Sequence, residues 1–201
     1  MKVKANPAYE RFRRTLNVHR ALFLPWSGAS YRATTLDYPK AEQILSGEGS
    51  FLNGGRWNAI RSFRAVYGST SDVVAVAESR ATASYAGIPY LFRTPRLLVT
   101  IEFELARVLD LTNPEIAGVF DATSEEFRLE DWRKVQSAGD ESATQALGRA
   151  CFDAGANALL VSSARVPDGI NVVYFPENHS GVAEAFVCEP GKLDRIRGRD
   201  E

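Results

Sequence analysis

The 201 residues, 45% apolar and 24% charged, fit one ordinary globular domain and exclude a collagen, a disulfide miniprotein and a wholly disordered chain. No apolar run approaches the roughly 18 residues of a membrane helix and none follows the charged start, so we expect a cytoplasmic protein with no signal peptide and no membrane partner. The net charge of −1 conceals a basic first third, because residues 1–67 carry 11 Lys and Arg against 4 Asp and Glu, which leaves room for an anionic ligand.

In chain order, the first part of the sequence predicts short elements around a glycine-rich stretch. We expect a basic helix over 6–16, a first strand over 18–24 and a loop over 28–38. The glycines between residues 47 and 55 predict a second loop. The other elements expected here are a helical turn at 39–45, a short strand at 65–68, and a helix that Ser71 or Asp72 can cap and that reaches about residue 85.

The second part predicts strands rich in β-branched residues and helices that begin at capping boxes. Alternating side chains predict strands over 96–105 and 107–111. Two capping boxes predict helices near 124–136 and 142–154. The boxes are Thr123 with Glu126 and Ser142 with Gln145, Gly155 is placed to end the second helix, and three further strands are expected at 157–162, 170–175 and 184–188.

These elements indicate an α+β fold, because strands stand at both ends of the chain without a steady βαβ alternation. We therefore predict a single domain of mixed β-sheets with flanking helices over 18–190, preceded by a helical extension at 1–17 and followed by a polar tail at 191–201. Gly47-x-Gly49 lacks the third glycine of a dinucleotide fingerprint, and no Gly-Lys-Ser/Thr phosphate loop is present. The two cysteines and two histidines make no disulfide framework or zinc site, so we predict no metal, although a carboxylate site for magnesium stays open.

Glu78 is an acidic side chain in an apolar part of the helix expected up to residue 85. A carboxylate among small apolar side chains is costly to bury unless something pairs with it or binds it. Glu78 is therefore a candidate for the floor of a cleft; the alternative is a surface pair with an arginine such as Arg80. Its neighbours three and four residues away are Val74, Ala75, Ala81 and Thr82.

The stretch Gly54-Gly55-Arg56-Trp57-Asn58 combines backbone freedom with side chains that suit a ligand. Paired glycines allow a sharp turn or a close approach of the backbone to a ligand. The next three residues offer a cation, an aromatic plane and an amide. The alternative is a turn with a packed tryptophan.

Taken in order, these residues resemble the RES domain, and the likeness covers about residues 18–188. That family is named for an Arg, a Glu and a Ser, which we place at Arg32, Glu78 and Ser163. The residues that carry the resemblance are Tyr31-Arg32, Gly47-x-Gly49-Ser50, Gly54-Gly55-Arg56-Trp57-Asn58, Val66-Tyr67-Gly68-Ser69, Ala77-Glu78, Trp132-x-x-x-Gln136, Ser163-Ala164 and Asn171-Val172-Val173-x-x-Pro176-x-Asn178-His179.

The resemblance implies a bacterial toxin that consumes NAD+. RES proteins are toxins of a toxin–antitoxin class whose antitoxin carries an Xre-like helix-turn-helix, and their fold resembles that of ADP-ribosyltransferases. By resemblance, the chain cleaves the nicotinamide–ribose bond of NAD+, which is a substrate and not a cofactor, and an antitoxin occludes the active site. The acceptor of ADP-ribose stays open between water, phosphate and a target protein, with a slight preference for a protein by analogy with the transferases.

The site residues implied by the resemblance suit this chemistry. The carboxylate of Glu78 can stabilise positive charge developing on the ribose. Arg32 can hold the pyrophosphate through two hydrogen bonds, and Tyr67 can stack on the nicotinamide ring. These three are the predicted catalytic residues, and those predicted to bind NAD+ are Arg32, Gly55, Arg56, Trp57, Asn58, Ser69, Ser163 and Asn171.

A competing hypothesis is a non-catalytic module that binds a nucleotide or a nucleic acid through the basic first third. The basic residues there are not interleaved with a regular aromatic platform. The sequence pI of 6.2 also lies far below the values above about 9 that are typical of nucleic-acid-binding domains. We therefore predict an enzyme without a direct nucleic-acid partner.

Overall fold

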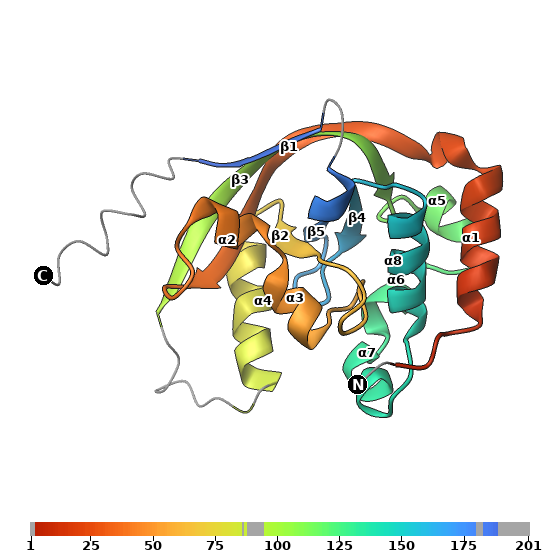
Figure 1. Cartoon of the computed structure of the whole chain (residues 1–201), viewed down its shortest axis with the longest axis horizontal. Helices are drawn as coiled ribbons and strands as arrows, with labels where there is room; N and C mark the ends of the chain where they lie inside the picture. The colour runs from red at the N-terminus through yellow and green to blue at the C-terminus, as the bar shows by residue number, and fades with distance from the viewer. Residues whose placement is uncertain (1–2, 86, 88–94, 180–182, 189–201) are drawn as a thin grey trace, which may run out of the picture.

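A mixed β-sheet forms the centre of the computed structural model, which describes residues 3–85, 87, 95–179 and 183–188 (Figure 1). The polar tail expected at 191–201 lies outside these residues. The strands are β1 (Phe23–Thr35), β2 (Val66–Ser69), β3 (Arg96–Asp110), β4 (Ala158–Ser162), β5 (Ile170–Tyr174) and β6 (Glu184–Val187).

The strand order is β1-β2-β5-β4-β3-β6, and an additional pairing joins β1 to β3. This pairing closes the first five strands of that order into a ring. β6 lies outside the ring and pairs with residues 101–104 of β3. β1 and β3 run antiparallel from the pair Phe23 and Leu109 to the pair Thr35 and Arg96, and together they arch over one side of the molecule (Figure 1). β3 and β4 are parallel, whereas the other pairs are antiparallel, so the sheet is mixed.

The strands at the middle of the sheet are buried on both faces. Because successive side chains of a strand point to opposite faces, β4 and β5 contribute alternate residues to two apolar clusters. Leu159 and Val173 belong to the cluster that includes α8, whereas Leu160 and Val172 belong to the cluster on the opposite face. The sheet therefore separates two parts of the core.

The helices surround this sheet, and α1 packs against α8. Phe12 and Leu16 of α1 are buried in the cluster that α8 shares, so the segment predicted as an N-terminal extension completes the core. No helix of the described ranges is long and apolar enough to cross a membrane. The helices are α1 (Ala8–Val18), α2 (Ala41–Leu45), α3 (Glu48–Asn53), α4 (Asp72–Tyr85), α5 (Pro114–Gly118), α6 (Ser124–Leu129), α7 (Trp132–Ser137) and α8 (Ala143–Asp153), with 3-10 turns at Arg20–Leu22 and Pro176–Asn178.

The first strand differs most from the sequence-based expectation. Most of the range 18–24 is not a strand, because α1 runs to Val18 and a 3-10 turn follows, and only Phe23 and Leu24 belong to β1. The loop expected at 28–38 is instead mostly β1, whose polar and small residues are held in the strand by continuous pairing with β3. Tertiary pairing outweighs the weak local β-propensity of this segment.

The glycine-rich stretch and the 124–136 segment also differ in detail. The glycines bracket a helix, α3, with Gly47 (φ 66°) and Gly54 (φ 76°) at its two ends. The single helix expected over 124–136 is divided into α6 and α7. Glu130 breaks it because its backbone is extended and its carboxylate accepts hydrogen bonds from Ala143 N (2.7 Å) and Thr144 N (2.8 Å) at the start of α8. Both capping boxes are confirmed.

Candidate active site

A cavity of about 440 Å³ opens between the sheet, α4, α7 and the loop after α3, within the roughly 300–1,000 Å³ of small-ligand sites. Tyr67 and Ser69 of β2 line it together with Asn171 and Val173 of β5. These residues alternate along antiparallel neighbours, and Ser69 pairs directly with Asn171, so their side chains share one face. The cavity therefore forms where β1, β2 and β5 meet.

Glu78 reaches this cavity from α4, and its position is fixed by two donors. Its Oε1 accepts hydrogen bonds from Ser163 Oγ (2.7 Å) and Asn171 Nδ2 (3.0 Å). Ser69 Oγ donates to Asn171 Oδ1 (2.7 Å) and thereby orients that amide. The second carboxylate oxygen, Oε2, has no hydrogen-bond partner among the residues that the structure describes. Glu78 is thus a half-buried carboxylate that is oriented through one oxygen and keeps the other for a ligand.

Arg32 enters the same cavity from β1. Its Nη1 donates a hydrogen bond to the backbone oxygen of Tyr67 (2.6 Å), whereas its Nε is enclosed without a partner within the described part of the chain. Burial lowers the pKa of this guanidinium from its ordinary value. A buried donor without a partner is costly, so a cation held in this way is suited to an anionic ligand.

Tyr67 connects the strand to the loop that follows α3. Its hydroxyl accepts a hydrogen bond from Trp57 N (3.0 Å) and donates one to Asn58 Oδ1 (2.8 Å). Burial raises the pKa of Tyr67 far above that of a free tyrosine, so the hydroxyl stays protonated and keeps donating. The hydroxyl therefore anchors the loop, and stacking of the ring on nicotinamide stays a prediction.

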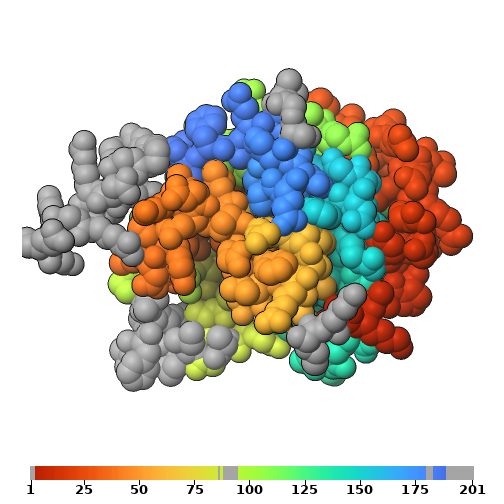
Figure 2. All heavy atoms as spheres, viewed as in Figure 1, coloured from red at the N-terminus to blue at the C-terminus, as the bar shows by residue number. Residues whose placement is uncertain are grey.

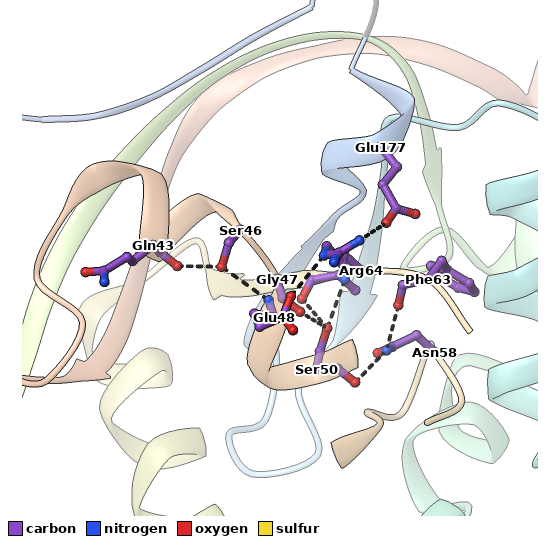
Figure 3. A network of polar contacts seen from close by, with 10 residues as sticks. Gln43, Ser46, Gly47, Glu48, Ser50, Asn58, Phe63, Arg64 and Glu177 are labelled. Atoms are coloured by element: carbon purple, nitrogen blue, oxygen red, sulfur yellow. Dashed lines mark hydrogen bonds and ion pairs between the residues drawn. The ribbon is translucent and has the colours of Figure 1, made fainter. Parts of the chain in front are cut away.

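Trp57 and Asn58 lie deeper than their motif suggests. The Trp57 side chain is 2% exposed and packs edge-on against Phe127, with ring centroids 5.8 Å apart. Asn58 is fully buried, and its amide donates to the backbone oxygens of Ser50 (2.9 Å) and Phe63 (3.2 Å) (Figure 3). We assign both side chains to positioning the loop, and direct contact with a ligand stays a prediction for them.

A polar network at the side of the cavity formed by Ser50 and Ala65 holds α3 in place (Figure 3). Ser50 Oγ donates to the backbone oxygen of Ala65 (2.7 Å) and accepts from its N–H (2.9 Å). Arg64 bridges Glu48 (3.1 Å) and Glu177 (2.8 Å), as Figure 3 shows. Figure 2 shows that the orange α3 region adjoins the blue C-terminal part of the chain at the surface. α3 is thereby tied to both β2 and the segment after β5.

Replacing Gly55 with alanine should destabilise this loop. The added methyl would overlap the Tyr67 hydroxyl and lie 2.8 Å from Asn58 Oδ1, so the hydrogen bonds that anchor the loop would have to shift. We expect the free energy of unfolding to fall by about 2 kcal/mol and the melting temperature by about 4–8 °C. Gly49→Ala is the matched control because no atom lies within 4 Å of its added methyl. Equal melting temperatures for both variants would contradict the packing described here.

Three further arginines border the cavity. Arg56 is the one that the sequence predicted to bind NAD+. Its Nη1 donates to the backbone oxygens of Phe127 (2.7 Å) and Glu130 (2.8 Å), so part of its guanidinium holds the α6–α7 segment. Sequence reasoning did not single out the other two, Arg133 and Arg165. Arg133 follows Trp132 of a recognised motif, which is the signal that could have found it.

The structure brings nearly all of the predicted site residues to one place. The two that do not line the cavity, Asn58 and Ser163, act on residues that do, namely Tyr67 and Glu78. Within the described ranges, no group of three His, Cys, Asp or Glu side chains could hold a metal ion. The predicted residues on the cavity wall are Arg32, Gly55, Arg56, Trp57, Tyr67, Ser69, Glu78 and Asn171.

Comparisons with known proteins identify the family and the fold of the chain. The family model described as the RES domain matches residues 29–195. Proteins named NAD(+) phosphorylase MbcT, from Mycobacterium tuberculosis and Mycobacterium bovis, are 30% identical over 118 residues, which is 58% of this chain and 61% of their own length. A chain in the crystal structure of the M. tuberculosis MbcT-MbcA toxin-antitoxin complex has a TM-score of 0.61 at 21% identity, over 96% of this chain and 98% of that chain. The predicted α+β fold is confirmed.

Proposed function

The chain belongs to the RES domain family, and from that premise we propose that it cleaves the nicotinamide–ribose bond of NAD+ as the toxin of a toxin–antitoxin pair. One observation carries the proposal: Glu78, whose Oε2 has no partner among the described residues, lines the same cavity as Arg32, whose buried Nε also has none among them. The names of the curated relatives, which describe proteins that act on NAD+, support the proposal further.

The two groups suggest how the dinucleotide lies. Arg32 is the cation of the inner wall and suits the pyrophosphate, which carries the negative charge of NAD+. Glu78 suits the nicotinamide ribose, since its Oε2 can accept a hydrogen bond from a ribose hydroxyl and face developing positive charge. In this orientation Tyr67 and the loop at Gly55 border the nicotinamide end.

The bond cleavage needs charge stabilisation more than proton transfer. Nicotinamide departs as a neutral molecule because the bonding electron pair returns to its ring nitrogen, so no general acid is required. Positive charge moves to the ribose, and a fixed carboxylate stabilises it without reorganising. Ser163 and Asn171 are positioning residues in this scheme, because they act by orienting Glu78.

The acceptor is a small molecule in this proposal. The preference for a target protein rests on analogy with ADP-ribosyltransferases alone. The relatives that match three fifths of their length are named phosphorylases, which favours degradation of NAD+. We therefore propose that the chain depletes NAD+ in the cytoplasm and that an antitoxin restrains it by covering the cavity. A chain of similar fold comes from a solved toxin–antitoxin complex, which supports the existence of such a partner.

The test is nicotinamide release by the purified chain. Incubation with NAD+ should yield nicotinamide and an ADP-ribosyl product, separated by chromatography and identified by mass. Expression of the wild-type chain should arrest bacterial growth and lower cellular NAD+. Binding of NAD+ without any nicotinamide release, or tight DNA binding without turnover in a filter-binding assay, would instead support the non-catalytic module.

A further inference from the structure

Two arginines that line the cavity have no acidic partner among the residues that the structure describes. Arg133 is the second residue of α7, and Arg165 lies in the segment that follows β4. Neither guanidinium makes a hydrogen bond or ion pair with any residue of the described ranges, although six other ion pairs form in them. Two positive charges that line one cavity repel each other, and an anion bound between them would offset this repulsion.

Arg133 is held in place by aromatic rings. Its guanidinium carbon lies 4.4 Å from the ring centroid of Trp132 and 4.5 Å from that of Tyr85 at the end of α4. Stacking of this kind uses the faces of the guanidinium and leaves its in-plane N–H donors for another partner. Burial lowers the pKa of Arg133, and the nearby charge of Arg165 lowers it too, which an anion bound between the two would relieve.

Arg165 is held by the same serine that orients Glu78. Ser163 Oγ accepts hydrogen bonds from the backbone N–H of Arg165 (3.0 Å) and of Val166 (3.2 Å) while it donates to Glu78 Oε1. The backbone at Arg165 is therefore fixed relative to the carboxylate. Its side chain is exposed and can close on a ligand at the mouth of the cavity.

These two arginines belong to the reacting end of the cavity. Both line the cavity that Glu78 lines, and Ser163 Oγ joins the backbone N–H of Arg165 to the carboxylate of Glu78, whereas Arg32 enters from β1 and binds the backbone oxygen of Tyr67. The cation assigned to the pyrophosphate is thus distinct from the pair beside Glu78. An acceptor must approach the ribose carbon that loses nicotinamide, and Glu78 marks that position.

We propose that Arg133 and Arg165 form the binding site for inorganic phosphate, the acceptor of the ADP-ribosyl group, an inference that rests on the proposed NAD+ cleavage. In this step an unprotonated oxygen of HPO₄²⁻ forms a bond to C1 of the ribose while the C1–N bond to nicotinamide breaks. The electron pair leaves with neutral nicotinamide, and the proton that stays on the phosphate ester is exchanged with solvent. Paired arginines suit this dianion because each can offer two N–H donors.

The test is the dependence of the rate on phosphate concentration. With Arg165→Gln and Arg133→Gln, we expect the KM for phosphate to rise at least about tenfold, since each variant removes charge-assisted hydrogen bonds, while the KM for NAD+ changes less than about threefold. Arg80→Gln is the matched control: it removes an exposed arginine of α4 that does not line the cavity, and both constants should stay as in the wild type.

The outcomes separate this inference from the activity itself. Wild-type nicotinamide release that phosphate does not accelerate, or variants with an unchanged KM for phosphate, would overturn the phosphate site and leave NAD+ cleavage standing. A rise confined to the KM for NAD+ would assign the pair to the pyrophosphate and overturn it as well. Absence of nicotinamide release by the wild type under every condition would reject the proposed function. If the loss of stacking on Trp132 destabilises Arg133→Gln, the KM for phosphate of Arg165→Gln alone tests the phosphate site.

Discussion

Replacing Glu78 with glutamine is expected to lower the rate of nicotinamide release at saturating NAD+ by about 10²- to 10³-fold, or about 2.7–4 kcal/mol in activation free energy. Glutamine keeps an oxygen that can accept the hydrogen bonds from Ser163 and Asn171, so the cavity should keep its shape. What it removes is the negative charge, which is the property that stabilises a cationic ribose. The measurement is the steady-state rate of nicotinamide release by chromatography.

Asp72→Asn is the matched control for this substitution. Asp72 is an exposed carboxylate at the start of the same helix, and it does not line the cavity. Its replacement should leave the rate within about twofold of the wild type, because surface charges act weakly through solvent. Equal rates for Glu78→Gln and the wild type would remove Glu78 from the mechanism, whatever the fold of the variant.

Replacing Arg32 with glutamine is expected to raise the KM for NAD+ by about 10- to 100-fold, because charge-assisted hydrogen bonds to a phosphate are worth about 1.5–3 kcal/mol. Glutamine is too short to keep the hydrogen bond from Nη1 to the backbone oxygen of Tyr67, but the backbone pairing of β1 with β3 does not depend on that side chain, so the sheet should tolerate the change. The effect should fall mainly on KM, since Arg32 holds the substrate away from the reacting carbon. The same variant should relieve growth arrest when expressed in bacteria.

Two comparisons make the Arg32 result specific. Arg32→Lys keeps the charge but loses the planar fork of donors, so its KM should lie between those of the wild type and Arg32→Gln. Arg20→Gln, at an exposed arginine before β1, should behave as the wild type. Equal toxicity of Arg32→Gln and the wild type would show that growth arrest has another source.

The sequence predicted those parts of the fold that depend on local signals. The capping boxes at Thr123 and Ser142 fix helix starts through contacts three residues apart, so they could be recognised without the rest of the chain. β1 could not be recognised in this way, because its polar residues form a strand only by pairing with β3, some 70 residues later in the sequence. The segment between Gly47 and Gly54 was predicted to be a loop, but the two glycines mark the ends of α3. A six-residue helix is too short to show a helical periodicity in its sequence.

The candidate site divides in a similar way. Glu78 was found because a carboxylate in an apolar helical face is anomalous, and the structure places it at the cavity. The depth of Trp57 and Asn58 could not be inferred, because it depends on Phe127 and on backbone oxygens of other segments. Arg133 was missed because it is a candidate ligand-binding residue only by its position beside Arg165 and Glu78. These residues are far apart in the sequence and come together only in the fold.

The central claim is that one dinucleotide spans the distance between a guanidinium on β1 and a carboxylate on α4. The most direct measurement is a crystal structure of the chain bound to an NAD+ analogue whose ribose ring oxygen is replaced by a methylene, which resists cleavage. We predict the pyrophosphate against Arg32 and the ribose hydroxyls against Glu78 Oε2. An analogue bound outside this cavity, or inside it with its ribose out of reach of Glu78, would contradict the account.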